Sequence, residues 1–187
     1  ELVSGGKGDD VLTVTDGAPV TIDGGSGFDE VVLADDFGAT VDLSGVELVS
    51  GGTGDDVLTV TDGAPVTLDG GSGFDSVQLT DEFGSTVALS GVEAVTGGEG
   101  DDVLTVTDGA PVTIDGGSGF DEVVLADDFG ATVDLSGVES VTGGEGDDVL
   151  TVTDGAPVTI DGGSGFDEVV LADGPGGTVL VEGVETV

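Results

Sequence analysis

The sequence predicts an all-β protein built as a parallel β-solenoid, with short strands joined by turns rich in glycine and aspartate. Three observations predict this fold class. The 187-residue chain repeats itself every 46 residues, apolar and polar residues alternate in runs of about five, and glycine clusters separate these runs at fixed offsets. Because such a short strand cannot bury its apolar face alone, near-identical units are expected to stack on one another.

The repeat begins with ELVSGG at residue 1 and returns as ELVSGG at 47, EAVTGG at 93 and ESVTGG at 139. We expect a single solenoid domain over residues 1–187, consisting of four units (1–46, 47–92, 93–138 and 139–184) and the start of a fifth (185–187). The similarity of the units indicates recent duplication or deliberate consensus construction. The chain begins at Glu1 without Met, so we expect it to be an excised or engineered piece of a longer protein.

Five strands are predicted in the first unit, at residues 11–15, 19–23, 30–34, 40–44 and 46–50. Alternate residues such as Leu12 and Val14 are expected to face the core. In the fifth strand Val46 and Val49 keep their place in every unit, and their spacing of three predicts a bend. Helices are disfavoured by the Val, Thr and Gly content. A β-sandwich of repeated hairpins is the alternative, but it needs connections that four near-identical units could share.

Each unit contains two glycine-rich motifs, which in the first unit are GGKGDDVLT at 5–13 and GGSGFDEVV at 24–32. Glycine allows a tight loop to adopt positive φ and to turn its carbonyl oxygens toward one point. Aspartate then adds a short carboxylate, and six to eight such oxygens are what Ca²⁺ requires. The eight candidate metal ligands are the aspartates at the sixth motif position: Asp10, Asp29, Asp56, Asp75, Asp102, Asp121, Asp148 and Asp167.

The motif resembles the nonapeptide GGxGxDxUx, with U a large apolar residue, of the RTX or haemolysin-type calcium-binding family. The resemblance implies an RTX-like β-roll in which Ca²⁺ lies between stacked loops, bound by these aspartates and by backbone carbonyls of the same loops. It also implies export of the unfolded chain through a one-step secretion channel and an extracellular or cell-surface location. RTX runs usually place nonapeptides end to end, whereas the loops of this chain are separated in the sequence.

The spacing of the loops allows two arrangements. Successive loops lie alternately 19 and 27 residues apart. If 19 residues form one coil and 27 residues form a larger, three-stranded coil, all eight loops stack on one edge and leave seven gaps. We expect this arrangement, and with it about seven Ca²⁺ ions. If each unit instead forms five half-turns, successive units place their loops on opposite edges and fewer complete sites result.

Composition restricts the partners and the chemistry. There are 40 acidic residues against one base, Lys7, and a formal charge of −39, so we expect neither nucleic acid nor membrane insertion. No apolar run approaches the roughly 20 residues of a membrane span. His, Cys and Arg are absent, so the usual catalytic groups are missing and we expect no enzyme. An ice-binding threonine ladder is disfavoured because Glu30 and Val32 interrupt the outward Thr13 and Thr15.

We therefore expect a calcium-binding structural segment of a secreted or cell-surface protein, of adhesin or surface-layer type, that folds on binding Ca²⁺. Expected partners are calcium ions, with end-to-end or surface association in a larger extracellular protein. The alternatives are the calcium-dependent C-terminal repeat region of an exported enzyme or toxin, and a designed RTX-like repeat protein. Phe28, Phe37 and their equivalents are expected to be packing plugs. Residues 173–187, where the sequence departs from the other units, are expected to close or bend the last coil.

Overall fold

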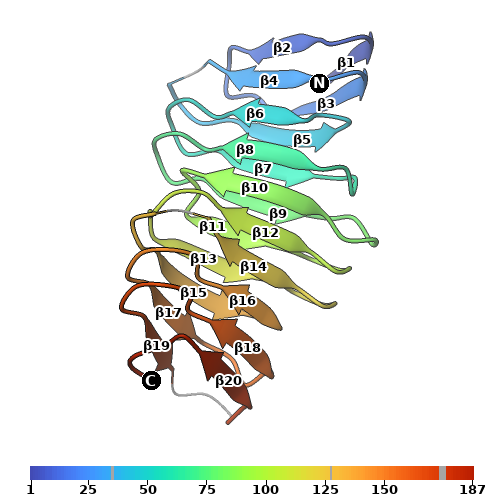
Figure 1. Ribbon diagram of the computed structural model, residues 1–187. Coiled ribbons are helices and arrows are strands. Elements are labelled where there is room, and N and C mark those ends of the chain that lie inside the picture. Colours follow the sequence, from blue (N-terminus) through green and yellow to red (C-terminus); the bar gives the residue numbers. More distant parts are fainter. Residues whose placement is uncertain (35, 127, 173–175) are drawn as a thin grey trace.

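The strands stack into a single solenoid of about nine turns (Figure 1). This computed structural model describes residues 1–34, 36–126, 128–172 and 176–187. The odd-numbered strands form one ten-stranded sheet and the even-numbered strands form another, and every pairing between neighbouring strands is parallel. Each coil thus contributes one strand to each sheet. The predicted all-β parallel solenoid is confirmed.

The strands of the odd sheet are β1 (Leu2–Lys7), β3 (Val20–Ser26), β5 (Thr40–Ser44), β7 (Val57–Val60), β9 (Ser76–Leu79), β11 (Ala94–Thr96), β13 (Val112–Asp115), β15 (Thr132–Ser136), β17 (Val149–Val152) and β19 (Glu168–Leu171). The strands of the even sheet are β2 (Val11–Val14), β4 (Glu30–Leu33), β6 (Leu48–Ser50), β8 (Val66–Asp69), β10 (Thr86–Ser90), β12 (Val103–Val106), β14 (Glu122–Leu125), β16 (Ser140–Thr142), β18 (Val158–Asp161) and β20 (Val179–Glu182).

Aliphatic side chains form ladders along the inside of both sheets. Val41 of β5 is in register with Leu58 of β7, which is in register with Val77 of β9, and all three are at most 2% exposed. Val46 and Val49 are both buried although they lie three residues apart, because the chain turns a corner at residues 45–47, where Gly45 has φ 55°. The predicted bend is confirmed. The alternation seen in the sequence thus sets which face of each strand enters the core.

The odd number of strands in a unit determines where the glycine motifs lie. With five strands per unit and two sheets, the segment VLTV forms β2 of the even sheet in the first unit but β7 of the odd sheet in the second. The expectation that all eight loops share one edge is therefore wrong, and the arrangement of five half-turns is correct. The predicted count of seven gaps is also wrong, because it assumed that all eight loops lie on a single edge.

The phenylalanines do not plug the core, which corrects the sequence-based expectation. The rings at the fifth position of a glycine motif are 56–58% exposed, and those in the DDF or DEF turns are 89–91% exposed. They project from turns that extend beyond the two sheets, so the aliphatic ladders fill the interior without them. The residues are Phe28, Phe74, Phe120 and Phe166 in the motifs, and Phe37, Phe83 and Phe129 in the turns.

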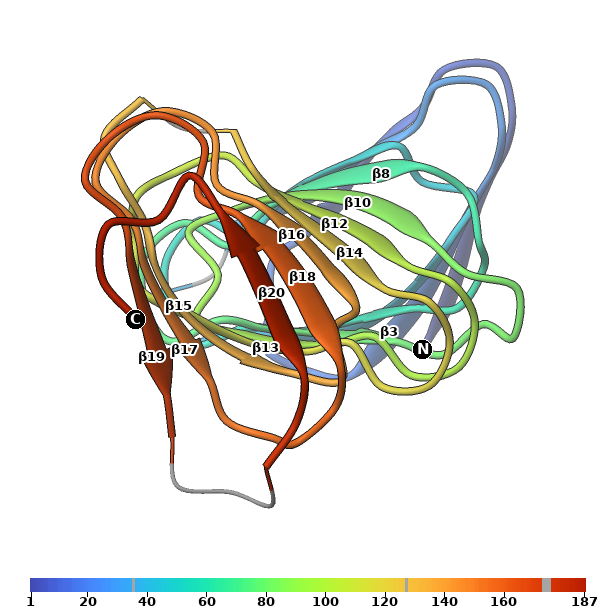
Figure 2. The same cartoon turned by 60° about the horizontal axis from the view of Figure 1, so that its bottom comes forward.

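At the C-terminal end the described residues continue the regular coil. β20 pairs with β18 (Figure 2), and the backbone N–H groups of Glu185 and Thr186 both donate to the Asp167 carbonyl. Val181 is in register with the buried Ile160 and is 41% exposed, so the apolar end of the solenoid is left open in this part of the chain. The expected closure of the last coil by 173–187 is not seen in 176–187; residues 173–175 lie outside the described part.

Candidate metal sites

The glycine motifs form two kinds of loop that stack in pairs. The GDD loops are residues 5–10, 51–56, 97–102 and 143–148, and the GFD loops are residues 24–29, 70–75, 116–121 and 162–167. Each GDD loop lies beside the GFD loop of its own unit. The pairs of the first and third units lie where the chain passes from the odd to the even sheet, and the other two pairs lie at the opposite edge.

Except in the first unit, whose GDD loop lies in the first coil, each pair is flanked by two other turns of the same edge. In the second unit the order along the edge is the turn ending at Ala39, the GDD loop 51–56, the GFD loop 70–75 and the corner 91–93. We call 45–47, 91–93, 137–139 and 183–185 the GVE corners. Since three other turns separate one pair from the next on the same edge, the structure contains four loop–loop gaps.

Glycine is required in these loops for two different reasons. The second and third glycines have positive φ, with values of 83° at Gly52 and 107° at Gly54, where other residues are strained. The first glycine is required by close packing instead. A Cβ on Gly51 would overlap the carbonyl oxygen of Gly70 and lie 2.8 Å from Asp56 Oδ2. The bare Cα of Gly51 therefore leaves room for two oxygens from two different loops.

A ladder of hydrogen bonds connects the predicted aspartates. The Ala39 N–H donates to Asp56 Oδ1 over 2.6 Å, and the Asp56 N–H donates to Asp75 Oδ1 over 2.8 Å. The Asp75 N–H then donates to Glu93 Oε2 over 2.7 Å. The loop-to-loop and loop-to-corner bonds recur in the other units, through the pairs Asp10–Asp29, Asp29–Glu47, Asp102–Asp121, Asp121–Glu139, Asp148–Asp167 and Asp167–Glu185.

The second carboxylate oxygens are buried beside the glycines. All the predicted aspartates except Asp10 of the first coil are 0% exposed. Within the described part of the chain, no hydrogen-bond donor reaches Oδ2 of six of them, namely Asp10, Asp29, Asp75, Asp102, Asp121 and Asp167. A buried carboxylate oxygen without a donor is costly, so these positions call for a positive charge or a proton.

Two further sets of acids take part that the sequence did not assign to the site. Asp55, beside the predicted Asp56, accepts the Phe74 N–H at Oδ1 over 2.8 Å and so fixes the GFD loop against the GDD loop. Glu93 accepts the Asp75 N–H, as described above. The signal for the glutamates was present, because Glu follows Gly-Val in every unit while the next residue varies among Leu48, Ala94, Ser140 and Thr186.

Burial shifts the titration of three carboxyl groups of the site. It raises the pKa of Asp75 and of Asp102 to about 6, from 3.8, and also raises the pKa of Asp121. The hydrogen bond from the Asp56 N–H lowers the pKa of Asp75, while the nearby carboxylates of Asp56 and Glu93 raise it further. At neutral pH Asp75 and Asp102 are thus ionised in surroundings that disfavour the charge.

We expect the chelated protein to gain β-structure as the pH falls from 7 to 4.5. A carboxyl group whose pKa is raised on folding contributes stability that is fully present below its unfolded value of 3.8 and is lost as the pH rises through about 6. Circular dichroism in chelator measures this trend. The double variant Asp75→Asn/Asp102→Asn should reduce the pH dependence more than Asp134→Asn/Glu82→Gln, which removes two exposed charges. Equal pH profiles for the two double variants would contradict the assignment.

The oxygens present suit calcium. Among the described residues no group of three or more acidic side chains could hold a metal ion by itself. A cation in a loop gap would therefore be bound by carboxylate oxygens together with backbone carbonyls such as that of Gly70. Ca²⁺ accepts this mixed oxygen shell at 2.3–2.6 Å, whereas Mg²⁺ requires a tighter octahedron. The eight predicted aspartates occupy equivalent positions, and the structure brings them together as four pairs.

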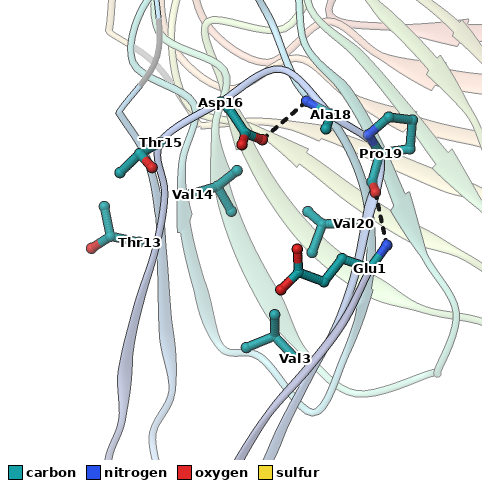
Figure 3. Close-up of a pocket in the computed structure, with 9 residues that line it drawn as sticks. All are labelled: Glu1, Val3, Thr13, Val14, Thr15, Asp16, Ala18, Pro19 and Val20. Carbon is teal, nitrogen blue, oxygen red and sulfur yellow. Dashed lines mark hydrogen bonds between the residues drawn. The ribbon is translucent and has the colours of Figure 1, made fainter.

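One pocket of about 190 Å³ lies at the N-terminal end of the solenoid and is bordered by Val3, Val14 and Val20 (Figure 3). At its rim the Glu1 amino group donates to the Pro19 carbonyl over 3.1 Å, and Asp16 accepts the Ala18 N–H. The pocket is thus the uncovered end of the aliphatic core. Of the residues that the structure describes, none belongs to a helix with the length and apolar character needed to cross a membrane.

Comparison with known families agrees with the geometry of the loops. The family model described as RTX calcium-binding nonapeptide repeat matches four times, at residues 1–18, 43–64, 88–110 and 135–156. Each matched segment contains one GDD loop, and the GFD loops fall outside the matched ranges. No curated protein and no solved structure gives a significant match.

Proposed function

Since the chain belongs to the RTX calcium-binding repeat family, we propose that it is a structural segment of a secreted or cell-surface protein that folds around Ca²⁺. The observation that carries this proposal is the buried Oδ2 beside the first glycine of the loops, facing a carbonyl oxygen of the next turn. Bound calcium supplies the positive charge that this oxygen set lacks. Its ligands are the eight aspartates named above and glycine carbonyls of the stacked loops.

We assign at least four ions to the chain, one in each loop–loop gap. In each gap the aspartate of the GFD loop faces the backbone of the GDD loop, as Asp121 does toward the Asp102 N–H at 2.9 Å. The ion then joins two coils that otherwise meet through backbone hydrogen bonds such as that from the Gly100 N–H to the Ser118 carbonyl. Calcium thus acts on the stacking of coils and carries no catalytic role.

An extracellular setting agrees with this role, since RTX repeats are typical of exported proteins. Extracellular calcium-binding modules work with dissociation constants of about 10⁻⁴–10⁻³ M, a range in which cytosolic calcium leaves the sites empty. The protein would then remain unfolded until export and fold outside the cell. Attachment within an adhesin or a surface layer is the role that fits a rigid, repetitive, acidic rod.

Titration calorimetry with CaCl₂ in low salt tests the proposal. We expect at least four ions per chain, with MgCl₂ giving little heat. Asp102→Asn keeps an oxygen for the hydrogen bond from the Ser85 N–H but removes a charge from the gap, so it should lose about one ion. Asp134→Asn, on the exposed side of β15, is the matched control and should bind as the wild type does. Absence of calcium binding by the wild type would refute the proposed function.

A further inference from the structure

The gap between each GFD loop and the neighbouring GVE corner repeats the arrangement of the loop–loop gap. Between the two loops, the Asp56 N–H donates to Asp75 Oδ1 over 2.8 Å. Between the GFD loop and the corner, the Asp75 N–H donates to Glu93 Oε2 over 2.7 Å. Glu93 thus accepts a hydrogen bond from the GFD loop in the same way as Asp75 accepts one from the GDD loop.

The backbone of the two gaps matches as well. A Cβ on Gly51 would overlap the Gly70 carbonyl oxygen, and a Cβ on Gly70 would overlap the Gly91 carbonyl oxygen. These two Cβ positions lie 2.8 Å from Asp56 Oδ2 and 2.8 Å from Asp75 Oδ2, respectively. Each gap therefore contains a glycine carbonyl, an oxygen of the preceding aspartate and a carboxylate from the following turn.

The aspartate of the GFD loop serves both gaps. Asp75 Oδ1 faces the GDD loop and accepts a hydrogen bond from the Asp56 N–H. Asp75 Oδ2 lies beside Gly70, which the carbonyl oxygen of the corner residue Gly91 also contacts. Asp75 is 0% exposed, and its Oδ2 is reached by no hydrogen-bond donor in the described ranges. The same holds for Asp29 and Asp121. A buried oxygen directed at the corner thus still lacks a positive partner.

Resting on the proposed function, we propose that each loop–corner gap is a second class of calcium site. Its protein ligands are Oδ2 of the GFD aspartate, the carboxylate of the GVE glutamate and the carbonyl oxygen of the corner glycine. Water completes the shell, as calcium sites allow. The four glutamates are Glu47, Glu93, Glu139 and Glu185, and the last of these is exposed at the end of the solenoid.

The number of bound ions distinguishes this proposal from the loop–loop sites alone. With one ion in each gap of either class, calorimetry or equilibrium dialysis should give about eight Ca²⁺ per wild-type chain. The variant E93Q/E139Q keeps an oxygen for the Asp75 and Asp121 N–H groups but removes two carboxylates, so it should bind about six. E82Q/E168Q removes two exposed glutamates and should still bind about eight.

Two results would overturn the corner sites and leave calcium binding by the paired loops intact. One is about four ions bound by the wild type, and the other is an unchanged count in E93Q/E139Q. A wild type that binds no calcium would overturn the proposed function and this inference together. Circular dichroism in saturating calcium checks that the variant is folded, and if it is not, the wild-type count decides between four ions and eight.

Discussion

In excess chelator and low salt, the protein is expected to show little β-structure, and added CaCl₂ should restore it in one cooperative transition. The formal charge of −39 makes the empty chain repel itself. Ordering the 38 glycines costs more backbone entropy than ordering other residues. Because every loop gap is formed by two different coils, the sites exist only in the stacked protein, and the energy of binding is largely energy of folding.

The size of the effect follows from mass action. A site at 100 times its dissociation constant stabilises the folded state by about 2.7 kcal/mol, so four sites contribute roughly 11 kcal/mol. A whole domain is typically stable by only about 5–15 kcal/mol, and removal of calcium is therefore expected to abolish the fold. Four ions carry eight positive charges against a formal charge of −39. Calcium therefore stabilises the fold by neutralising the buried carboxylates locally more than by reducing the total charge.

Circular dichroism during a calcium titration measures this transition. Titrations with NaCl and MgCl₂ at matched ionic strength are the controls, because salt screens the repulsion between exposed carboxylates without filling the gaps. We expect neither salt to restore the spectrum at the concentrations at which calcium does. A complete β-spectrum in chelator at low salt would show that the acidic solenoid is stable without metal, and the proposed function would be wrong.

The strands could be predicted from the sequence because a half-buried strand alternates its residues in a way that turns interrupt. The predicted runs 11–15 and 40–44 differ from β2 and β5 by at most one residue. The edge on which the loops lie could not be predicted in the same way. A coil of three strands and a series of three half-turns can be built from the same strands and turns. The alternation of apolar and polar residues shows which face of a strand is buried, but it does not show whether a coil contains two strands or three.

The candidate site was predictable only in part, for a related reason. The spacing of the motif identified Asp56 and Asp75, since carboxylate and glycine occur together in one loop. Glu93 lies 18 residues beyond Asp75 and contacts it only through the stacking of coils, so its recurrence after Gly-Val did not by itself show which loop it approaches. Phe74 and Phe83 were misjudged because an aromatic residue usually suggests burial, whereas here the turns extend beyond the core.

Substitution of a first glycine should be among the most damaging single changes in the chain. Gly70 does not have the positive φ that excludes other residues, so alanine is permitted there by the backbone itself. The added Cβ would nevertheless overlap the Gly91 carbonyl oxygen and lie 2.8 Å from Asp75 Oδ2. A backbone carbonyl cannot rotate away as a side chain can, so the corner must move off the loop.

We expect Gly70→Ala to cost about 3 kcal/mol in the free energy of unfolding, the upper end of the usual cost of overpacking. For a chain of this length that corresponds to a fall of roughly 6–12 °C in the melting temperature measured in calcium. Gly176→Ala is the matched control, because its Cβ would meet no atom of the described residues within 4 Å, and it should melt within about 2 °C of the wild type. Equal melting of both variants would mean that the gap between loop and corner opens without cost, in which case it could not hold its oxygens in place for an ion.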